Sequence, residues 1–91
     1  MTDTTVKDED PRPLRVIADE IFRDWKAMRE RGESHPAWPY ADAMRSLGSI
    51  EESYYADSGR SVVRYFISNA AAWRGETAKR VKAELKAMLD G

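Results

Sequence analysis

Residues 60–75 read Arg-Ser-Val-Val-Arg-Tyr-Phe-Ile-Ser-Asn-Ala-Ala-Ala-Trp-Arg-Gly, and this stretch decides the predicted fold. Its apolar residues recur at spacings of three and four, at Val62, Val63, Phe66, Ile67, Ala70 and Trp73. Such spacing is typical of an α-helix with one buried face. Because no other segment is as apolar, we predict a central helix near residues 59–74, stopped at Gly75, with the other helices packed around it.

Helical spacing also marks the segments on either side. Residues 13–31 place apolar side chains on one helical face, and Gly32 is a natural stop. A short second helix is predicted over residues 39–47, because Pro39 suits the first turn of a helix. Residues 76–89 consist largely of strong helix formers and predict the last helix.

The connection between the second and the central helix carries capping signals. Ser49 and Glu52 match a capping box, which predicts one further helical turn through Tyr54. Asp57 or Ser58 is then expected to cap the central helix. No segment has the alternation of a strand. The predicted fold is therefore all-α, a small single-domain bundle of about four helices.

The first residues differ from the rest in composition. Residues 1–12 are polar and acidic, so we predict a disordered acidic leader there and a single helical domain over residues 13–91. The chain has no cysteine, which leaves neither a disulfide nor a thiolate metal site. Its apolar runs stay below the roughly 18 residues of a membrane span, and its start does not read as a signal peptide. A cytoplasmic protein without membrane contact is predicted.

Catalytic chemistry has little support in the residue types. The chain has one histidine, His35, and no glycine-rich phosphate loop. His35 lies in an irregular connection without an identifiable carboxylate to orient it, whereas a nucleophile–base pair needs such a third group. We therefore predict a non-enzymatic protein without a cofactor or a metal ion.

The block Tyr-Phe-x-x-Asn-Ala-x-x-Trp-Arg-Gly at residues 65–75 carries a resemblance. Together with Pro39-Tyr40, Ala43-Met44 and the Lys-Ala-Glu-Leu-Lys run of residues 82–86, it resembles a group of small helical proteins of phages and bacteria. The resemblance implies a cytoplasmic, phage-like protein. It supplies no activity, cofactor or site.

The leading hypothesis is a small protein-interaction module, an adaptor or inhibitor that binds a cytoplasmic protein. Its candidate partner-binding residues are His35, Trp38, Tyr40, Trp73 and Arg74. Trp and Arg dominate binding hot spots, and the prolines beside Trp38 stiffen the connection, so little entropy is lost on binding. Two structural interpretations stay open: Trp73 as a core residue, and the Trp38 segment as a hydrophobic staple over the second helix.

A nucleic-acid-binding regulator is the alternative hypothesis. Residues 58–91 carry seven basic and three acidic side chains, a net charge of +4. The spacing of Ala71, Gly75 and Val81 resembles a helix-turn-helix with the last helix as reader. Salt dependence separates the two functions, because phosphate contacts give a steep salt slope. The basic side chains expected on the outer face of that helix are Lys79, Arg80, Lys82 and Lys86.

Overall fold

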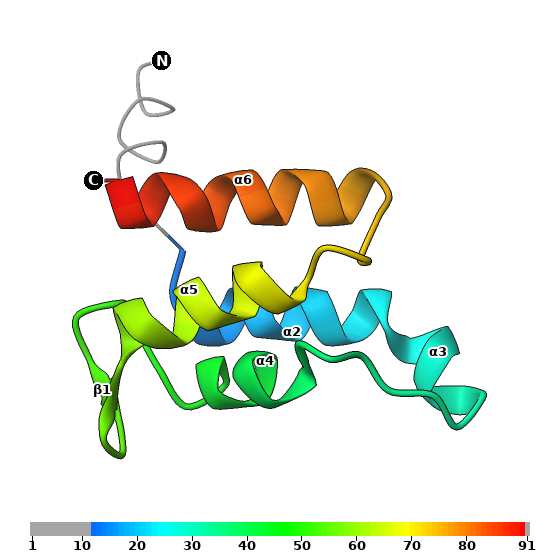
Figure 1. The fold of residues 1–91 in the computed structure, drawn as a ribbon, viewed down its shortest axis with the longest axis horizontal. Coiled ribbons are helices and arrows are strands. Elements are labelled where there is room, and N and C mark those ends of the chain that lie inside the picture. Colours follow the sequence, from blue (N-terminus) through cyan, green and yellow to red (C-terminus); the bar gives the residue numbers. More distant parts are fainter. Residues whose placement is uncertain (1–11, 91) are drawn as a thin grey trace.

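The computed structural model describes residues 12–90. This part of the chain is mainly α-helical, as the sequence predicts, with five helices and one short antiparallel hairpin (Figure 1). Except for Arg12, the predicted disordered leader over residues 1–12 lies outside the described residues. The helices are α2 (Leu14–Asp24), α3 (Lys26–Glu30), α4 (Trp38–Met44), α5 (Gly59–Asn69) and α6 (Glu76–Asp90), and the strands are β1 (Ser53–Tyr54) and β2 (Asp57–Ser58).

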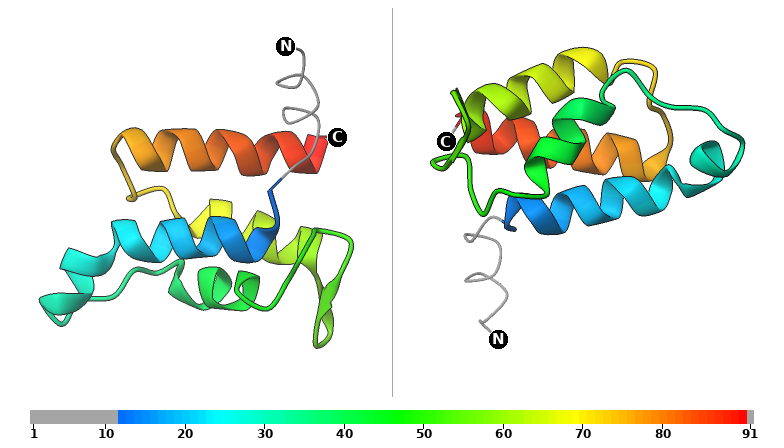
Figure 2. Two further views of the ribbon diagram at one scale, coloured as in Figure 1. Left: turned by 180° about the vertical axis from the view of Figure 1, so that it is seen from behind. Right: turned by 90° about the horizontal axis from the view of Figure 1, so that it is seen from below.

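Four of the helices surround one core. α4 and α6 each pack against both α2 and α5, and they do so from opposite sides (Figure 1 and Figure 2). α3 and the β1–β2 hairpin lie at opposite ends of the molecule (Figure 1). α5 therefore shares the core with three other helices instead of standing alone at its centre.

The core contains most of the apolar positions that the helical spacing singles out, although Ile67 is only partly buried against it. In α5 the side chains of Val62, Val63 and Phe66 are buried, and Phe66 has no exposed surface. Burying a side chain of this size contributes about 1.5–3 kcal/mol to the free energy of unfolding. α3 buries no residue. The rest of the buried apolar set is Leu14, Ile17, Ala18, Ile21, Trp25, Ala37, Ala41, Ala43, Met44, Leu47, Ala70, Trp73, Ala78, Val81 and Leu85.

The predicted helix over residues 13–31 is interrupted at Trp25. This residue has φ −90° and ψ 4° and separates α2 from α3, although its N–H still donates to the Ile21 carbonyl at 3.0 Å. Gly32 ends α3 as predicted, with φ 80°. The N–H of Glu33 then returns to the Met28 carbonyl at 3.1 Å, the bond pattern of a Schellman motif. The chain thereby turns back toward α2 at a fixed angle.

Close backbone packing at the start of α5 leaves room only for glycine at residue 59. The N–H of Gly59 donates to the Glu52 carbonyl at 2.6 Å, and a Cβ at Gly59 would lie only 2.7 Å from the Ser49 carbonyl oxygen. A larger residue would have to displace backbone atoms. Ser58 is the N-cap, one of the two predicted, and its Oγ accepts the N–H of Ser61 at 3.1 Å.

The helical turn predicted through Tyr54 does not form. Ser49 Oγ accepts the N–H of Glu51 at 3.1 Å, so part of the capping contact is present. The next residues pair instead as strand β1 with β2, with Tyr54 opposite Asp57. The first N–H groups of α5 need hydrogen-bond acceptors, and the N–H groups of Gly59 and Arg60 donate to the carbonyls of Glu52 and Ile50. These bonds hold the segment alongside the start of α5.

α5 ends at Asn69, so the prediction of a helix through residue 74 is wrong beyond this point. The carbonyl of Ala70 accepts the N–H of Trp73 at 3.0 Å and the Nζ of Lys82 at 2.7 Å, which closes a turn. This turn carries the Trp73 indole into the core, where it is only 5% exposed. Burying an indole removes roughly 150–250 Å² from water, which outweighs one further helical turn.

Phe66→Ala tests the assignment of the core. The substitution leaves a cavity on the buried face of α5, so we expect the free energy of unfolding to fall by about 3–5 kcal/mol in urea titrations. Tyr65→Ala is the matched control, because Tyr65 lies next to Phe66 but is 49% exposed. A loss below about 1 kcal/mol for Phe66→Ala would contradict its place in the core.

Candidate functional site

Trp25 lies at the meeting point of five other aromatic rings. Its indole is 2% exposed and stacks on the His35 ring at 4.7 Å between centroids, with an angle of 11° between the planes. Phe66 lies at 6.2 Å on another side. Trp73 approaches edge-on at 5.6 Å. Phe22 and Trp38 complete the set at 5.9 and 6.2 Å. Aromatic pairs in such arrangements each contribute about 0.5–1.5 kcal/mol beyond their buried area.

Two arginines cover the outer side of this cluster. Phe22 and Trp38 are half-buried and meet edge to face at 4.6 Å. The Arg29 guanidinium carbon lies 4.9 Å from the Trp38 ring centre, and that of Arg45 lies 5.2 Å from the Phe22 ring centre. Cation–π contacts of this kind are attractive by about 0.5–1 kcal/mol at exposed sites. We call Phe22, Arg29, Trp38 and Arg45 the arginine–aromatic face.

A shallow depression adjoins this face. The residues that line it come from α3, from the connection after it and from the first turn of α4. Pro36 in that connection and Pro39 in the first turn of α4 restrict the backbone, and the Schellman motif at Gly32 fixes where the connection begins. The depression is therefore held in place before any partner arrives. Its lining residues are Arg29, Gly32, Glu33, Ser34, His35, Pro36, Trp38 and Pro39.

His35 is a structural residue of the depression. Its Nδ1 accepts the N–H of Ala37 at 3.0 Å, so the proton of the neutral ring is on Nε2. Nε2 is buried and has no hydrogen-bond partner among the described residues. Burial, and secondly the positive charge of Lys82, lower the pKa of His35 below its ordinary value. The histidine is therefore neutral near pH 7, and no carboxylate within residues 12–90 is hydrogen-bonded to its ring.

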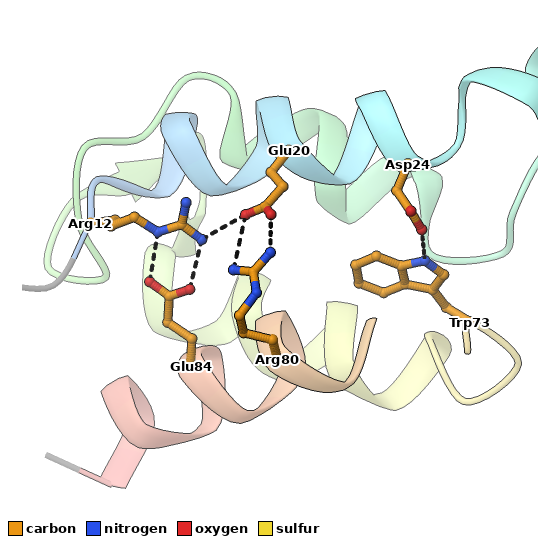
Figure 3. Close-up of polar contacts among 6 residues, drawn as sticks. All are labelled: Arg12, Glu20, Asp24, Trp73, Arg80 and Glu84. Atoms are coloured by element: carbon orange, nitrogen blue, oxygen red, sulfur yellow. Dashed lines mark hydrogen bonds and ion pairs between the residues drawn. The ribbon is translucent and has the colours of Figure 1, made fainter. Parts of the chain in front are cut away.

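The predicted partner-binding residues fall into three places. His35 and Trp38 lie together, and both line the depression. Tyr40 is half-buried elsewhere, where its ring lies 5.6 Å from that of Tyr65. The Trp73 side chain is buried in the core, which agrees with its structural interpretation in the sequence analysis. Its indole N–H donates to Asp24 at 2.7 Å (Figure 3).

A charged network fixes α6 against α2. Arg12 forms two hydrogen bonds with Glu84, at 2.7 and 2.9 Å, and a third with Glu20 at 2.9 Å (Figure 3). Arg80 binds the same Glu20 carboxylate. Arg80 first, and then Arg12, hold the pKa of Glu20 below its usual range against the opposing effect of burial. Arg80, one of the four basic residues predicted on the outer face of the last helix, is therefore part of the contact between α6 and α2.

The remaining basic residues of α6 border a second depression. Lys79 and Lys86 are exposed, whereas Lys82 donates to the Ala70 carbonyl. The other residues that line it are Trp73, Arg74, Gly75, Glu76 and Ala83. We call this surface the basic depression. The helix-turn-helix spacing is not realised, because Ala71 lies in the turn after α5 and not within a helix.

Sequence reasoning did not assign Phe22, Arg29 or Arg45 to a site. The seven-residue spacing of Phe22 and Arg29 places both on one helical side and could have indicated their proximity. Arg45 follows α4, a separate helix, and reaches Phe22 only through the tertiary fold. No local spacing in the sequence could have paired these two residues.

Comparison with protein-family models, with curated proteins and with solved structures found no match for this chain. Within residues 12–90, no helix has the length and apolarity to cross a membrane. No three histidine or carboxylate side chains gather as metal ligands in this same part of the chain. Function is therefore inferred from the arginine–aromatic face and from the basic depression.

The pKa of His35 predicts how stability depends on pH. Because the folded-state pKa is lowered from 6.5, the unfolded chain binds more protons, and the free energy of unfolding falls as pH drops from about 6.5 through the folded-state pKa. His35→Phe keeps the stacked ring and removes the titration. We expect the urea midpoint of the unsubstituted chain, measured relative to that of His35→Phe, to fall as pH drops from about 7.5 to 5. A constant difference would contradict a buried neutral histidine.

Proposed function

We propose that this protein is a non-enzymatic protein-interaction module, an adaptor or inhibitor, and that the arginine–aromatic face binds its partner. The observation that carries the proposal is the placement of the Arg29 and Arg45 guanidinium groups on the rings of Trp38 and Phe22. Trp and Arg are the residue types most enriched among binding hot spots. Here the two arginines lie on the outer sides of the Trp38 and Phe22 rings, and both rings also pack against the core.

Rigidity supports the same proposal. Trp38 contacts Phe22 and Trp25, and its backbone N–H donates to the His35 carbonyl at 2.9 Å. A side chain held in this way loses little conformational entropy when a partner binds. The Arg29 and Arg45 side chains are restricted by their ring contacts. A larger share of the interaction energy is then available as affinity.

The proposed setting is the bacterial cytoplasm, with a phage origin. It follows from the resemblance of the block at residues 65–75 to phage and bacterial proteins. The polar composition of the chain, with 34% charged residues, agrees with this setting.

Trp38→Ala tests the proposal by affinity capture from bacterial lysate with the immobilised protein. A central aromatic anchor is typically worth about 2–4 kcal/mol of binding, so we expect the captured proteins to be lost. Tyr55→Ala is the control, since Tyr55 is an exposed aromatic (89%) on the distant hairpin and should leave capture unchanged. Circular dichroism must show equal helicity for both variants. Equal capture by both folded variants would contradict the proposed role of Trp38.

A nucleic-acid-binding regulator stays the second candidate, because the basic depression brings Arg74 together with Lys79, Lys82 and Lys86 of α6. The positive end of a helix dipole and exposed lysines favour phosphate. Glu76 in the first turn and the engagement of Lys82 with Ala70 reduce this attraction. We therefore rank this candidate below the first.

Titration with random duplex DNA separates the two candidates. We expect no salt-sensitive binding tighter than about 10 µM, which is weaker than a dedicated DNA-binding protein shows. The variant to compare carries Arg74→Ser, Lys79→Ser and Lys86→Ser, since these three residues are exposed. Arg80 is left unchanged, because it pairs with Glu20 and its loss would affect the fold. Sub-micromolar binding that disappears in this variant, with a salt slope lower by about three, would establish the second candidate.

A further inference from the structure

We infer that the segment bound by the arginine–aromatic face is acidic, a peptide whose Asp or Glu carboxylate pairs with Arg29 while an apolar neighbour packs on Trp38. This inference deepens the proposed function and rests on it. It names the chemistry of the partner, which the aromatic rings alone do not determine.

In the part of the chain that the structure describes, the positive charges around the face outnumber their carboxylate partners by one. Three carboxylates lie near it, and each already has a partner: Glu33 pairs with Arg31 at 3.1 Å, Glu30 with Lys26 at 3.9 Å and Asp42 with Arg45 at 3.5 Å. Arg29 has no carboxylate partner among the described residues. The face therefore carries an uncompensated positive charge at the edge of the depression.

The position of Arg29 suits a carboxylate. A guanidinium on an aromatic ring keeps its N–H groups available, and its planar fork matches the two oxygens of a carboxylate. The Trp38 ring at 4.9 Å restricts the guanidinium, so less freedom is lost when the bidentate pair forms. Pro36 and Pro39 line the same depression and offer apolar surface next to the charge.

The titration of His35 gives a way to detect a bound charge at the depression. His35 lines the depression, and the charge of Lys82 contributes to the lowering of its pKa, after burial. A bound carboxylate would oppose the positive charge of Lys82 and raise the pKa of His35, an effect that a neutral ligand would not produce.

An acidic peptide fits better than nucleic acid at this face. A phosphate backbone needs several unpaired cations in a row, and of the two arginines of this face only Arg29 lacks a carboxylate partner within residues 12–90, since Arg45 is shared with Asp42. One or two carboxylates flanked by an apolar side chain match one free guanidinium and one half-buried indole.

The probe is a fluorescein-labelled peptide of alternating Glu and Leu, compared with its Gln analogue by fluorescence polarisation at low salt. A charged hydrogen bond contributes about 1.5–3 kcal/mol, so we expect the Glu peptide to bind roughly 10–100-fold more tightly than the Gln peptide. Added salt should narrow this difference. Nuclear magnetic resonance should show the pKa of His35 rising when the Glu peptide binds.

Arg29→Met is the decisive variant, because it keeps an unbranched stem near Trp38 and removes the charge. It should abolish the preference for Glu over Gln and leave the weaker binding of the Gln peptide. Arg64→Met is the matched control, because it removes the charge of an exposed arginine on α5, away from the depression, and this variant should keep the preference.

Several results would overturn the inference. These are equal affinity for the two peptides, no binding of either, a preference that survives Arg29→Met, or a preference that depends on Lys79 and Lys86. Concentration-dependent self-association that Arg29→Met removes would assign the face to a second copy of this chain instead. Binding of the Gln peptide that requires Trp38 but shows no preference for Glu would reject the acidic partner and leave the proposed function standing. Unchanged capture by Trp38→Ala would reject the proposed function itself.

Discussion

The packing of the Trp25 indole against its five aromatic neighbours is the interaction on which the rest of the structure depends. It joins α2, the connection after α3, α4, α5 and the turn before α6 at one buried point. None of these segments is long: α5 has 11 residues and α4 has seven. Isolated helices of this length are marginal in water, so tertiary packing must supply their stability.

The same cluster links the core to the surface. On its inner side Trp25 contacts Phe66 and Trp73, and on its outer side Phe22 and Trp38 contact the arginines. A surface built on rigid core residues is preorganised, which is the physical basis of the proposed function. The charged network of Arg12, Glu20, Arg80 and Glu84 acts separately, holding α6 to α2 on another side (Figure 3).

Helical spacing was enough to predict the mainly α-helical class and most of the core. Local signals predicted the stop at Gly32 and narrowed the N-cap of α5 to Asp57 or Ser58, of which Ser58 is the cap. Such signals failed where tertiary contacts override local preference. Trp73 fits the helical period of α5, but its indole is buried by leaving the helix, with its N–H bound to Asp24. Likewise, the hairpin forms because of contacts with the start of α5, which no local pattern reveals. Of the candidate site, the sequence analysis singled out Trp38 and His35. The contact of Arg45 with Phe22 arises only from the packing of α4 against α2, so the sequence alone did not reveal it.

Nuclear Overhauser contacts from the Trp25 indole protons test the central claim most directly. The structure predicts contacts to the rings of His35, Phe66 and Trp73 within one folded state, with further contacts to Phe22 and Trp38. Sharp indole resonances that show contacts to Phe66 but none to His35 or Trp38 would contradict the account. The connection would then not be fixed to the core, and the arginine–aromatic face would lose its rigid support.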